Sequence, residues 1–212
     1  MMMKNKIKRI LDDFKRVRQR GKLPDIFGAE THEFALNPPL TESEVAAFES
    51  AYRVALPAEY RLFLLHVGNG GAGPYYGLFR LGEMDDGFEF EQWEEGAFVG
   101  ELAAPFPHSD PWNDLTGEPD DDYDDEEVYE QSLDEFDERY FDPALMNGAI
   151  PICHLGCALR QWLVVTGPEA GNVWCDDRAD RRGTYPLTAP GKKRVTFYQW
   201  YRDWLDEVLT GS

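Results

Sequence analysis

The chain has 212 residues, of which 42% are hydrophobic and 14% aromatic, and its 21 Lys and Arg against 40 Asp and Glu give a formal charge of −19. This length fits one domain, or at most two small ones, with a sizeable core. Six Trp, ten Tyr and thirteen Phe exclude a generally disordered acidic protein, and the acidic balance argues against direct nucleic-acid binding, which needs a basic face.

The sequence carries no sign of a membrane or secretory segment. No apolar run approaches the roughly 20 residues that span a bilayer, and residues 1–19 lack the apolar centre of a signal peptide. Cys153, Cys157 and Cys175 form an odd, sparse set, which indicates reduced thiols and not a disulfide scaffold. We therefore expect a cytoplasmic protein that does not bind membranes, and the oligomeric state stays open.

Charge is distributed unevenly along the chain. Residues 1–22 hold nine basic and two acidic side chains, whereas residues 83–142 hold 24 acidic side chains and one basic one, Arg139. The centre of the acidic stretch, residues 118–127, reads EPDDDYDDEE and is typical of a solvated loop. Because aromatic residues flank it, the stretch is either a contact surface for a partner or a poorly ordered insertion that aids solubility.

Helical periodicity marks two segments near the N-terminus. The first has a basic polar face, and we expect it to pack against its own acidic domain, although such helices also lie on membranes or dock partners. A second helix is predicted to start at the capping box Thr41–Glu44. The apolar faces consist of Ile7, Ile10, Leu11, Phe14 and Val17 in the first helix, and of Val45, Phe48 and Tyr52 in the second.

The remaining predicted elements mix strands and helices. A third helix opens at Leu56-Pro57 and stops at the glycine-rich segment 68–73. Strands are predicted at 75–81, 150–153, 159–165 and 172–176, the last two forming an antiparallel pair, with a short edge strand at 184–187. A helix is predicted at 126–141, and a terminal helix packs its aromatic stripe in the core: Phe197, Trp200, Tyr201, Trp204, Leu205 and Val208.

The densest group of reactive side chains is Cys153-His154-x-x-Cys157, with Cys175 downstream. Structural zinc sites usually contain a second closely spaced cysteine pair, which this chain lacks. His154 is a poor general base for Cys153, because adjacent strand residues point to opposite faces. We therefore predict no catalytic residues, no metal and no cofactor, and keep a small hydrolase or metal-dependent enzyme built on these residues as an alternative.

Three motifs in order resemble the Smi1/Knr4 (SUKH) superfamily: the capped helix at residues 40–44, the segment LPAEYRLFLL at 56–65, and Asn69-Gly70-Gly71. The family pattern is L-P-x-x-[YF]-x-x-F-L followed by N-G-G. Residues 150–152, 163–165 and 171–174 also fit its second half, so that the resemblance covers roughly residues 40–209.

The resemblance implies an α+β fold, with a mainly antiparallel β-sheet packed by helices, as one SUKH-like domain. We assign residues 1–36 to a basic amphipathic helix and linker, and residues 37–212 to the SUKH-like domain with an acidic insertion at about 83–142. Bacterial members of the family look like immunity proteins that neutralise a cognate toxin of a polymorphic toxin system, often a nuclease. Fungal members look like interaction proteins in cell-wall regulation.

These implications, with the charge pattern, favour a non-catalytic immunity protein whose partner is a toxin domain. The alternative among binding proteins is a general scaffold resembling the fungal members. The expected partner-binding residues are Trp93, Glu94, Glu95, Asp120, Asp121, Asp122, Tyr123 and Asp124, unless binding uses the sheet face instead. The family-motif residues expected to be structural are Leu56, Pro57, Tyr60, Phe63, Asn69, Gly70 and Gly71.

Overall fold

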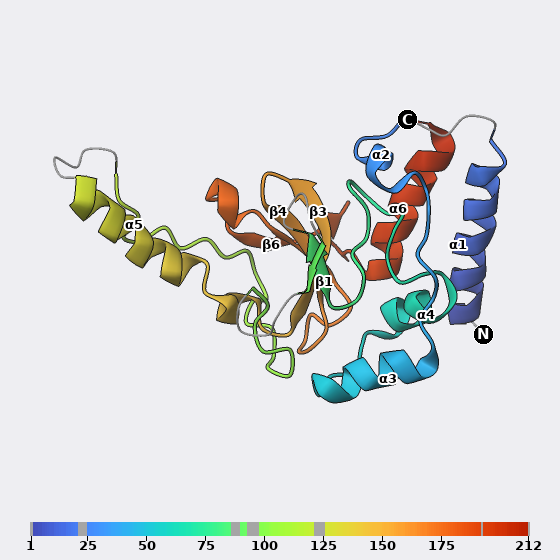
Figure 1. Cartoon of the computed structure of the whole chain (residues 1–212), viewed down its shortest axis with the longest axis horizontal. Helices are drawn as coiled ribbons and strands as arrows, with labels where there is room; N and C mark the ends of the chain where they lie inside the picture. The colour runs from blue at the N-terminus through green and yellow to red at the C-terminus, as the bar shows by residue number, and fades with distance from the viewer. Residues whose placement is uncertain are drawn as a thin grey trace.

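The computed structural model describes residues 2–20, 25–85, 90–92, 98–120, 126–191 and 193–211. In these ranges helices and a four-stranded antiparallel sheet share one core, the mixed α+β architecture that the sequence predicts (Figure 1). The helical elements are α1 (Met2–Arg18), α2 (Ala29–His32), α3 (Glu42–Ala51), α4 (Ala58–His66), α5 (Glu126–Tyr140), η1 (Pro143–Met146), η2 (Arg178–Asp180) and α6 (Phe197–Thr210). The strands are β1 (Glu83–Asp85), β2 (Phe90–Gln92), β3 (Ala149–Gly156), β4 (Leu159–Val164), β5 (Val173–Asp176), β6 (Thr184–Pro186), β7 (Thr188–Ala189) and β8 (Lys193–Arg194).

The main sheet has the strand order β3-β4-β5-β6, and every neighbouring pair is antiparallel. The predicted pairing of β4 with β5 and the predicted edge strand β6 are confirmed. In the register Gln161 lies opposite Cys175, and Trp162 lies opposite Trp174. Because successive strand residues face opposite sides, Gln161 points toward α6, where Trp200 Nε1 donates a 2.8 Å hydrogen bond to its Oε1, and Trp162 points to the other face.

The predicted strand at 75–81 is wrong. Tyr75 and Gly77 have φ angles of +52° and +106°, so the chain turns in the left-handed region where an extended strand is impossible. Only Leu78 pairs, through isolated bridges to Gly71 and to Cys153 on β3. A further bridge joins Gly71 to Leu36, so that single residues from three segments extend the β3 edge of the sheet.

Both predicted helices of the motif region are confirmed. Thr41 caps α3 through a reciprocal capping box, in which Glu44 N donates to Thr41 Oγ1 at 3.3 Å and Thr41 N donates to Glu44 Oε2 at 2.7 Å. Pro57 precedes α4, which buries Tyr60 and Phe63 almost completely. These two rings make edge-on contacts with Phe197, so α4 is fixed on the terminal helix.

The terminal helix α6 is the centre of the core. The six residues of its predicted apolar stripe are each at most 5% exposed, which confirms that the stripe packs inside the protein. Thr196 caps the helix start by accepting a hydrogen bond from Gln199 N, and Gly211 ends the helix in the left-handed conformation.

Helix α1 lies beside α6, as Figure 1 shows. The ring of Phe14 is 6.2 Å from that of Tyr201 and 6.1 Å from that of Trp204. Asp13 of α1 forms a buried ion pair with Arg202 of α6. The basic helix thus packs on the protein's own core, while the boundary between residues 36 and 37 stays a prediction.

Candidate protein-interaction surface

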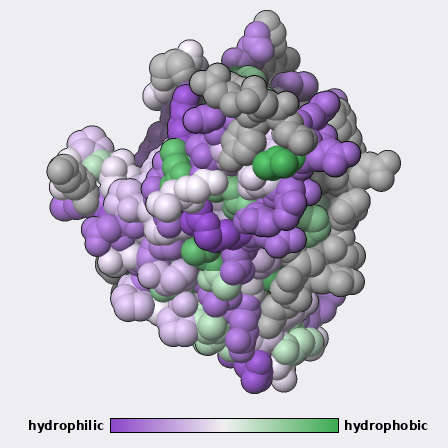
Figure 2. Space-filling model, turned by 90° about the vertical axis from the view of Figure 1, so that its left-hand side faces the viewer, coloured by the Kyte–Doolittle hydropathy of each residue, from purple (hydrophilic) through white to green (hydrophobic). Residues whose placement is uncertain are grey.

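An acidic arm, defined here as residues 110–120 together with α5, lies on the side of the sheet away from α6. Helix α5 projects from the body of the protein (Figure 1) and carries seven acidic side chains and one basic one among 15 residues. Viewed from this side, the described surface is mostly hydrophilic with scattered hydrophobic residues (Figure 2). The predicted helix at 126–141 is confirmed, and the last two residues of the predicted loop, Glu126 and Glu127, are its first turn.

Arg181 fastens the arm to the body. Its guanidinium forms ion pairs of 2.9 Å with Glu118 and 2.8 Å with Asp137, from the two parts of the arm. The same group lies over the rings of Phe136 and Tyr140, 4.8 Å and 5.4 Å from their centroids. One cation between two carboxylates and two aromatic rings combines charge pairing with cation–π attraction, so it holds loop and helix together.

Aromatic contacts attach the arm to the sheet edge. Trp112 forms a two-hydrogen-bond bridge with Thr184 of β6, both at 2.8 Å, and its ring stacks on Tyr140 with centroids 5.5 Å apart. The Tyr140 hydroxyl donates a 2.6 Å hydrogen bond to Asn113 Oδ1. The end of α5 nearest the sheet is therefore well packed, and its orientation is fixed by the body of the protein.

The outward face of α5 carries an acidic stripe, defined as Glu126, Glu130, Asp134 and Glu138. The four residues recur every fourth position and are all exposed, and within the part of the chain that the structure describes none of them forms an ion pair. Like charges at this spacing destabilise a helix by about 0.2–0.5 kcal/mol per pair. The stripe is thus a row of repelling charges that a basic surface would neutralise.

The structure places one of the eight predicted partner-binding residues. Asp120 is exposed at the end of the loop that precedes α5, whereas Trp93, Glu94 and Glu95 lie outside the described residues, as do Asp121, Asp122, Tyr123 and Asp124. Their role stays a prediction. The stripe on α5 was not among the predicted sites, although its spacing of four residues is visible in the sequence.

The motif turn Asn69-Gly70-Gly71 joins α4 to the sheet extension. Asn69 Oδ1 accepts a 2.9 Å hydrogen bond from Leu81 N, and the Asn69 carbonyl accepts one of 3.0 Å from Asn37 Nδ2. Gly71 and Leu78 exchange backbone hydrogen bonds of 2.8 Å and 2.7 Å. These bonds join three segments at one point, which is a structural use of the motif.

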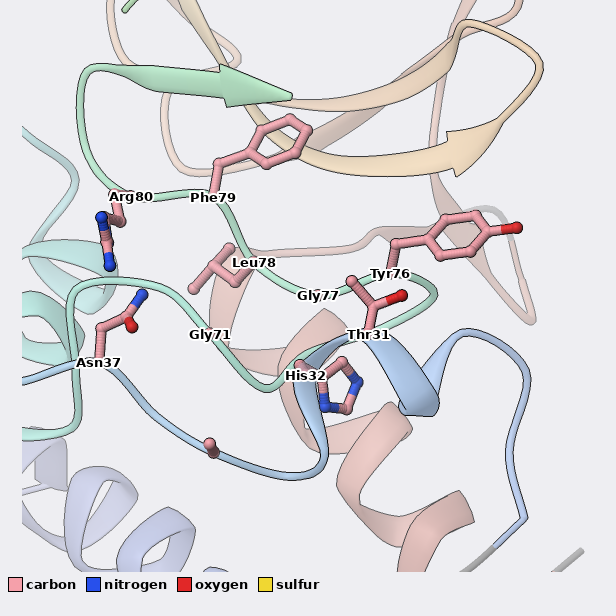
Figure 3. Close-up of a pocket in the computed structure, with 10 residues that line it drawn as sticks. Thr31, His32, Asn37, Gly71, Tyr76, Gly77, Leu78, Phe79 and Arg80 are labelled. Carbon is pink, nitrogen blue, oxygen red and sulfur yellow. The ribbon is translucent and has the colours of Figure 1, made fainter. Parts of the chain in front are cut away.

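A pocket of about 230 Å³ lies beside this turn, between residues 31–37 and 71–80 (Figure 3). His32 lines it, and Nδ1 of the imidazole accepts a 3.0 Å hydrogen bond from Phe34 N. Burial lowers the pKa of His32, so the ring is neutral at pH 7 and its Nδ1 lone pair is occupied. His32 therefore acts beside the turn as a structural hydrogen-bond acceptor.

Replacing Gly71 by Ala is expected to destabilise the protein by about 2–4 kcal/mol. Gly71 has a φ of +98°, and a Cβ atom would lie 2.5 Å from the Ala35 carbonyl oxygen, so strain and a backbone clash add together. Urea denaturation measures the loss. Gly117→Ala is the control, because Gly117 has a φ of +79° and open space around it, and should cost only about 1 kcal/mol; equal losses would contradict the close-approach explanation.

The three cysteines predicted as the densest group of reactive side chains differ in burial, and the two buried ones are poor nucleophiles. The Cys153 thiol is buried and donates a 3.1 Å hydrogen bond to the Pro74 carbonyl, and burial raises its pKa far above the usual range. Burial also raises the pKa of Cys175 to about 11, while Cys157 is exposed. Both buried thiols are therefore protonated at pH 7, whereas a nucleophile or a metal ligand would have to be a thiolate. Among the described residues, no group of three metal-ligating side chains occurs.

The sheet face opposite α6 is partly covered by the chain between residues 98 and 118. Phe106 packs edge-on against Trp174 at 4.8 Å. Beside it, Trp162, Phe98 and Phe141 line a pocket of about 240 Å³. This pocket is one opening on that sheet face, the alternative location for binding.

A comparison with protein-family models supplies the identification. The model of the SMI1 / KNR4 family (SUKH-1) matches residues 39–191, which include the capping box, α4, the Asn69-Gly70-Gly71 turn and the four strands of the main sheet. The chain belongs to this family. Neither a curated protein nor a solved structure matches it. Across the described residues, every helix is too short or too polar to cross a membrane.

Proposed function

We propose that this chain is a non-catalytic binding protein of the immunity type, which acts in the cytoplasm and neutralises a toxin with a basic, nucleic-acid-cleaving active site. Membership of the SMI1 / KNR4 family supports a role in protein binding. The observation that carries the proposal is the acidic stripe on α5, a row of four exposed carboxylates on a helix anchored at its base, none of which forms an ion pair with another described residue.

The stripe suits a basic cleft for electrostatic reasons. Neighbouring charges at i and i+4 are about 6 Å apart along the helix, within the Debye length of about 8 Å at physiological salt, so the fields of adjacent carboxylates reinforce one another at an approaching partner. Steering of this kind raises association rates by about 10- to 1,000-fold. An inhibitor that must reach a nuclease before its substrate gains directly from such steering.

The base of the acidic arm is already held in place before a partner binds. Binding is weakened when long side chains and loops must be ordered in the complex. Arg181 and Trp112 already hold the arm against the sheet in the free protein, which lowers that ordering entropy. We propose that Trp93 and Tyr123 supplement the stripe as apolar anchors, because aromatic side chains contribute most to the centres of interfaces.

Co-expression tests the proposal. The chain is produced together with the polypeptides that its neighbouring genes encode, and we expect one of them to be toxic alone, to lose its toxicity when the chain is present, and to form a salt-sensitive complex with it. The matched control is the variant that neutralises the acidic stripe, which should protect less at equal abundance. Cell death at the rate seen without the chain would overturn the proposal, and recovery of several housekeeping proteins in its place would favour the scaffold role.

A further inference from the structure

A second surface lies at the end of the protein away from α5, where α2 and α6 meet (Figure 1). There the segments around residues 26–27 and 74–75 and one face of α6 enclose a pocket of about 320 Å³. Four aromatic side chains and two carboxylates give it its chemistry: Phe27, Tyr75, Trp200, Trp204, Asp203 and Glu207.

Helix α6 supplies both chemical types from one stripe. Trp200, Asp203, Trp204 and Glu207 are spaced at i, i+3, i+4 and i+7, which places them on the same face of a helix. The two indoles are each 5% exposed, and the two carboxylates are exposed at the mouth. Helix α6 thus gives the pocket a buried aromatic floor with a negative edge, and the accessible aromatic surface comes from Phe27 and Tyr75, which are 63% and 38% exposed.

The two carboxylates of the pocket are not part of the ion pairs that the described residues form. In the described ranges, neither Asp203 nor Glu207 forms an ion pair, and no Lys or Arg lies over the rings of the pocket. Burial raises the pKa of Asp203, and the neighbouring Asp206 adds to the rise, while Arg202 opposes it. Both the rings and the carboxylates therefore favour a positive charge.

Elsewhere in the structure, arginine side chains of the chain itself lie between an aromatic ring and a carboxylate. Arg194 forms a 3.0 Å ion pair with Glu169 and lies 5.7 Å from the ring centroid of Trp174. Arg181 lies between aromatic rings and carboxylates at the base of the acidic arm. Lys6 does the same, 2.5 Å from Glu59 and 4.6 Å from the ring centroid of Tyr198, so in this fold a cationic side chain occupies such a site.

The mouth of the pocket is held in place before any partner arrives. Tyr75 has a left-handed φ of +52°, and the Cys153 thiol fixes the adjacent Pro74 carbonyl at 3.1 Å. Gly28 packs so closely that a Cβ atom there would lie 2.3 Å from the backbone carbonyl oxygen of Tyr75. The centroid of the Phe27 ring is 6.4 Å from that of the Tyr75 ring. Preorganised walls lower the ordering cost of binding.

We propose that this pocket binds an arginine side chain presented by a protein partner. Arginine fits better than lysine because its planar, weakly hydrated guanidinium stacks on the exposed rings of Phe27 and Tyr75, while its five donors reach carboxylates at the edge. The surface is separate from the acidic stripe, so this inference goes beyond the proposed function and does not depend on it.

The test uses the intact protein with ¹⁵N-labelled tryptophans and a blocked arginine, Nα-acetyl-arginine methylamide, as the probe. We expect saturable shifts of the Trp200 and Trp204 indole signals, with a dissociation constant on the order of 1 mM for a single side chain. The neutral isostere Nα-acetyl-citrulline methylamide should bind at least about 10-fold more weakly, because it lacks the charge that the cation–π and ionic contacts require.

Matched variants complete the design. Asp203→Asn with Glu207→Gln should weaken arginine binding at least about 10-fold, whereas Asp134→Asn with Glu130→Gln, the same change on α5, should leave it unaltered. All four side chains are exposed, so each variant should keep its melting temperature. Equal shifts with citrulline, equal binding by the first variant, or tighter binding of free L-arginine than of the blocked form would overturn the proposal, the last by pointing to a free amino acid as the ligand.

Discussion

Replacing Asp13 by Ala is expected to lower the free energy of unfolding by about 3–5 kcal/mol, as measured by urea denaturation. Asp13 and Arg202 are 7% and 5% exposed, so the carboxylate and the guanidinium pair in the interior. Without Asp13, the buried guanidinium keeps a single carboxylate partner, Asp206, whose side chain is 54% exposed. A buried charge that loses a partner retains its desolvation penalty, which makes this loss larger than that of a surface pair.

The neighbouring residue supplies the control. Asp12 is 52% exposed and lies 3.7 Å from Lys15, so Asp12→Ala should change stability by less than about 0.5 kcal/mol. The double variant Asp13→Leu with Arg202→Met should recover most of the loss, because apolar residues can replace a buried ion pair. A loss below about 1 kcal/mol for Asp13→Ala would mean that α1 is a dispensable addition to the core.

Neutralising the acidic stripe is expected to slow toxin association about 10-fold or more at low salt. The variant replaces Glu126, Glu130 and Glu138 by Gln and Asp134 by Asn, and association is followed by stopped-flow fluorescence across a series of salt concentrations. The dissociation rate should change less, because steering acts on the encounter. The free variant should be no less stable, since the repulsion between successive carboxylates is relieved.

A second quartet separates position from net charge. Asp12→Asn with Glu30→Gln, Glu33→Gln and Glu101→Gln removes four exposed charges from other surfaces. This control should retain most of the association rate and its salt dependence. If both quartets slow association equally, the effect belongs to the total charge of −19 and the stripe is not the binding surface.

Local patterns predicted the elements whose stability is local. The capping box at Thr41, the periodicity of α6 and the glycine-bounded turn between β4 and β5 each contain their signal within a few residues. Residues 75–81 contain the apolar and aromatic residues of a strand, but left-handed turns at Tyr75 and Gly77 leave Leu78 as the one residue of the segment that forms β-bridges. The sequence of this segment shows its strand propensity, but it does not show the tertiary contacts that favour a turn there.

The sites were harder to predict because they combine distant segments. Arg181 meets Glu118 and Asp137 only after the arm folds back onto the sheet, and no local pattern marks that pairing. The sequence predicts that the aromatic stripe of α6 packs in the core, which its burial confirms. Its second role, as the wall of a pocket, needs residues 26–27 and 74–75 beside it.

The most direct test of the central claim is a titration of the purified toxin domain with the purified chain, with nuclease activity as the readout. We expect activity to fall to zero at one chain per toxin, and to return as salt screens the acidic stripe. Full nuclease activity at a several-fold excess of the chain, in low salt, would contradict the account.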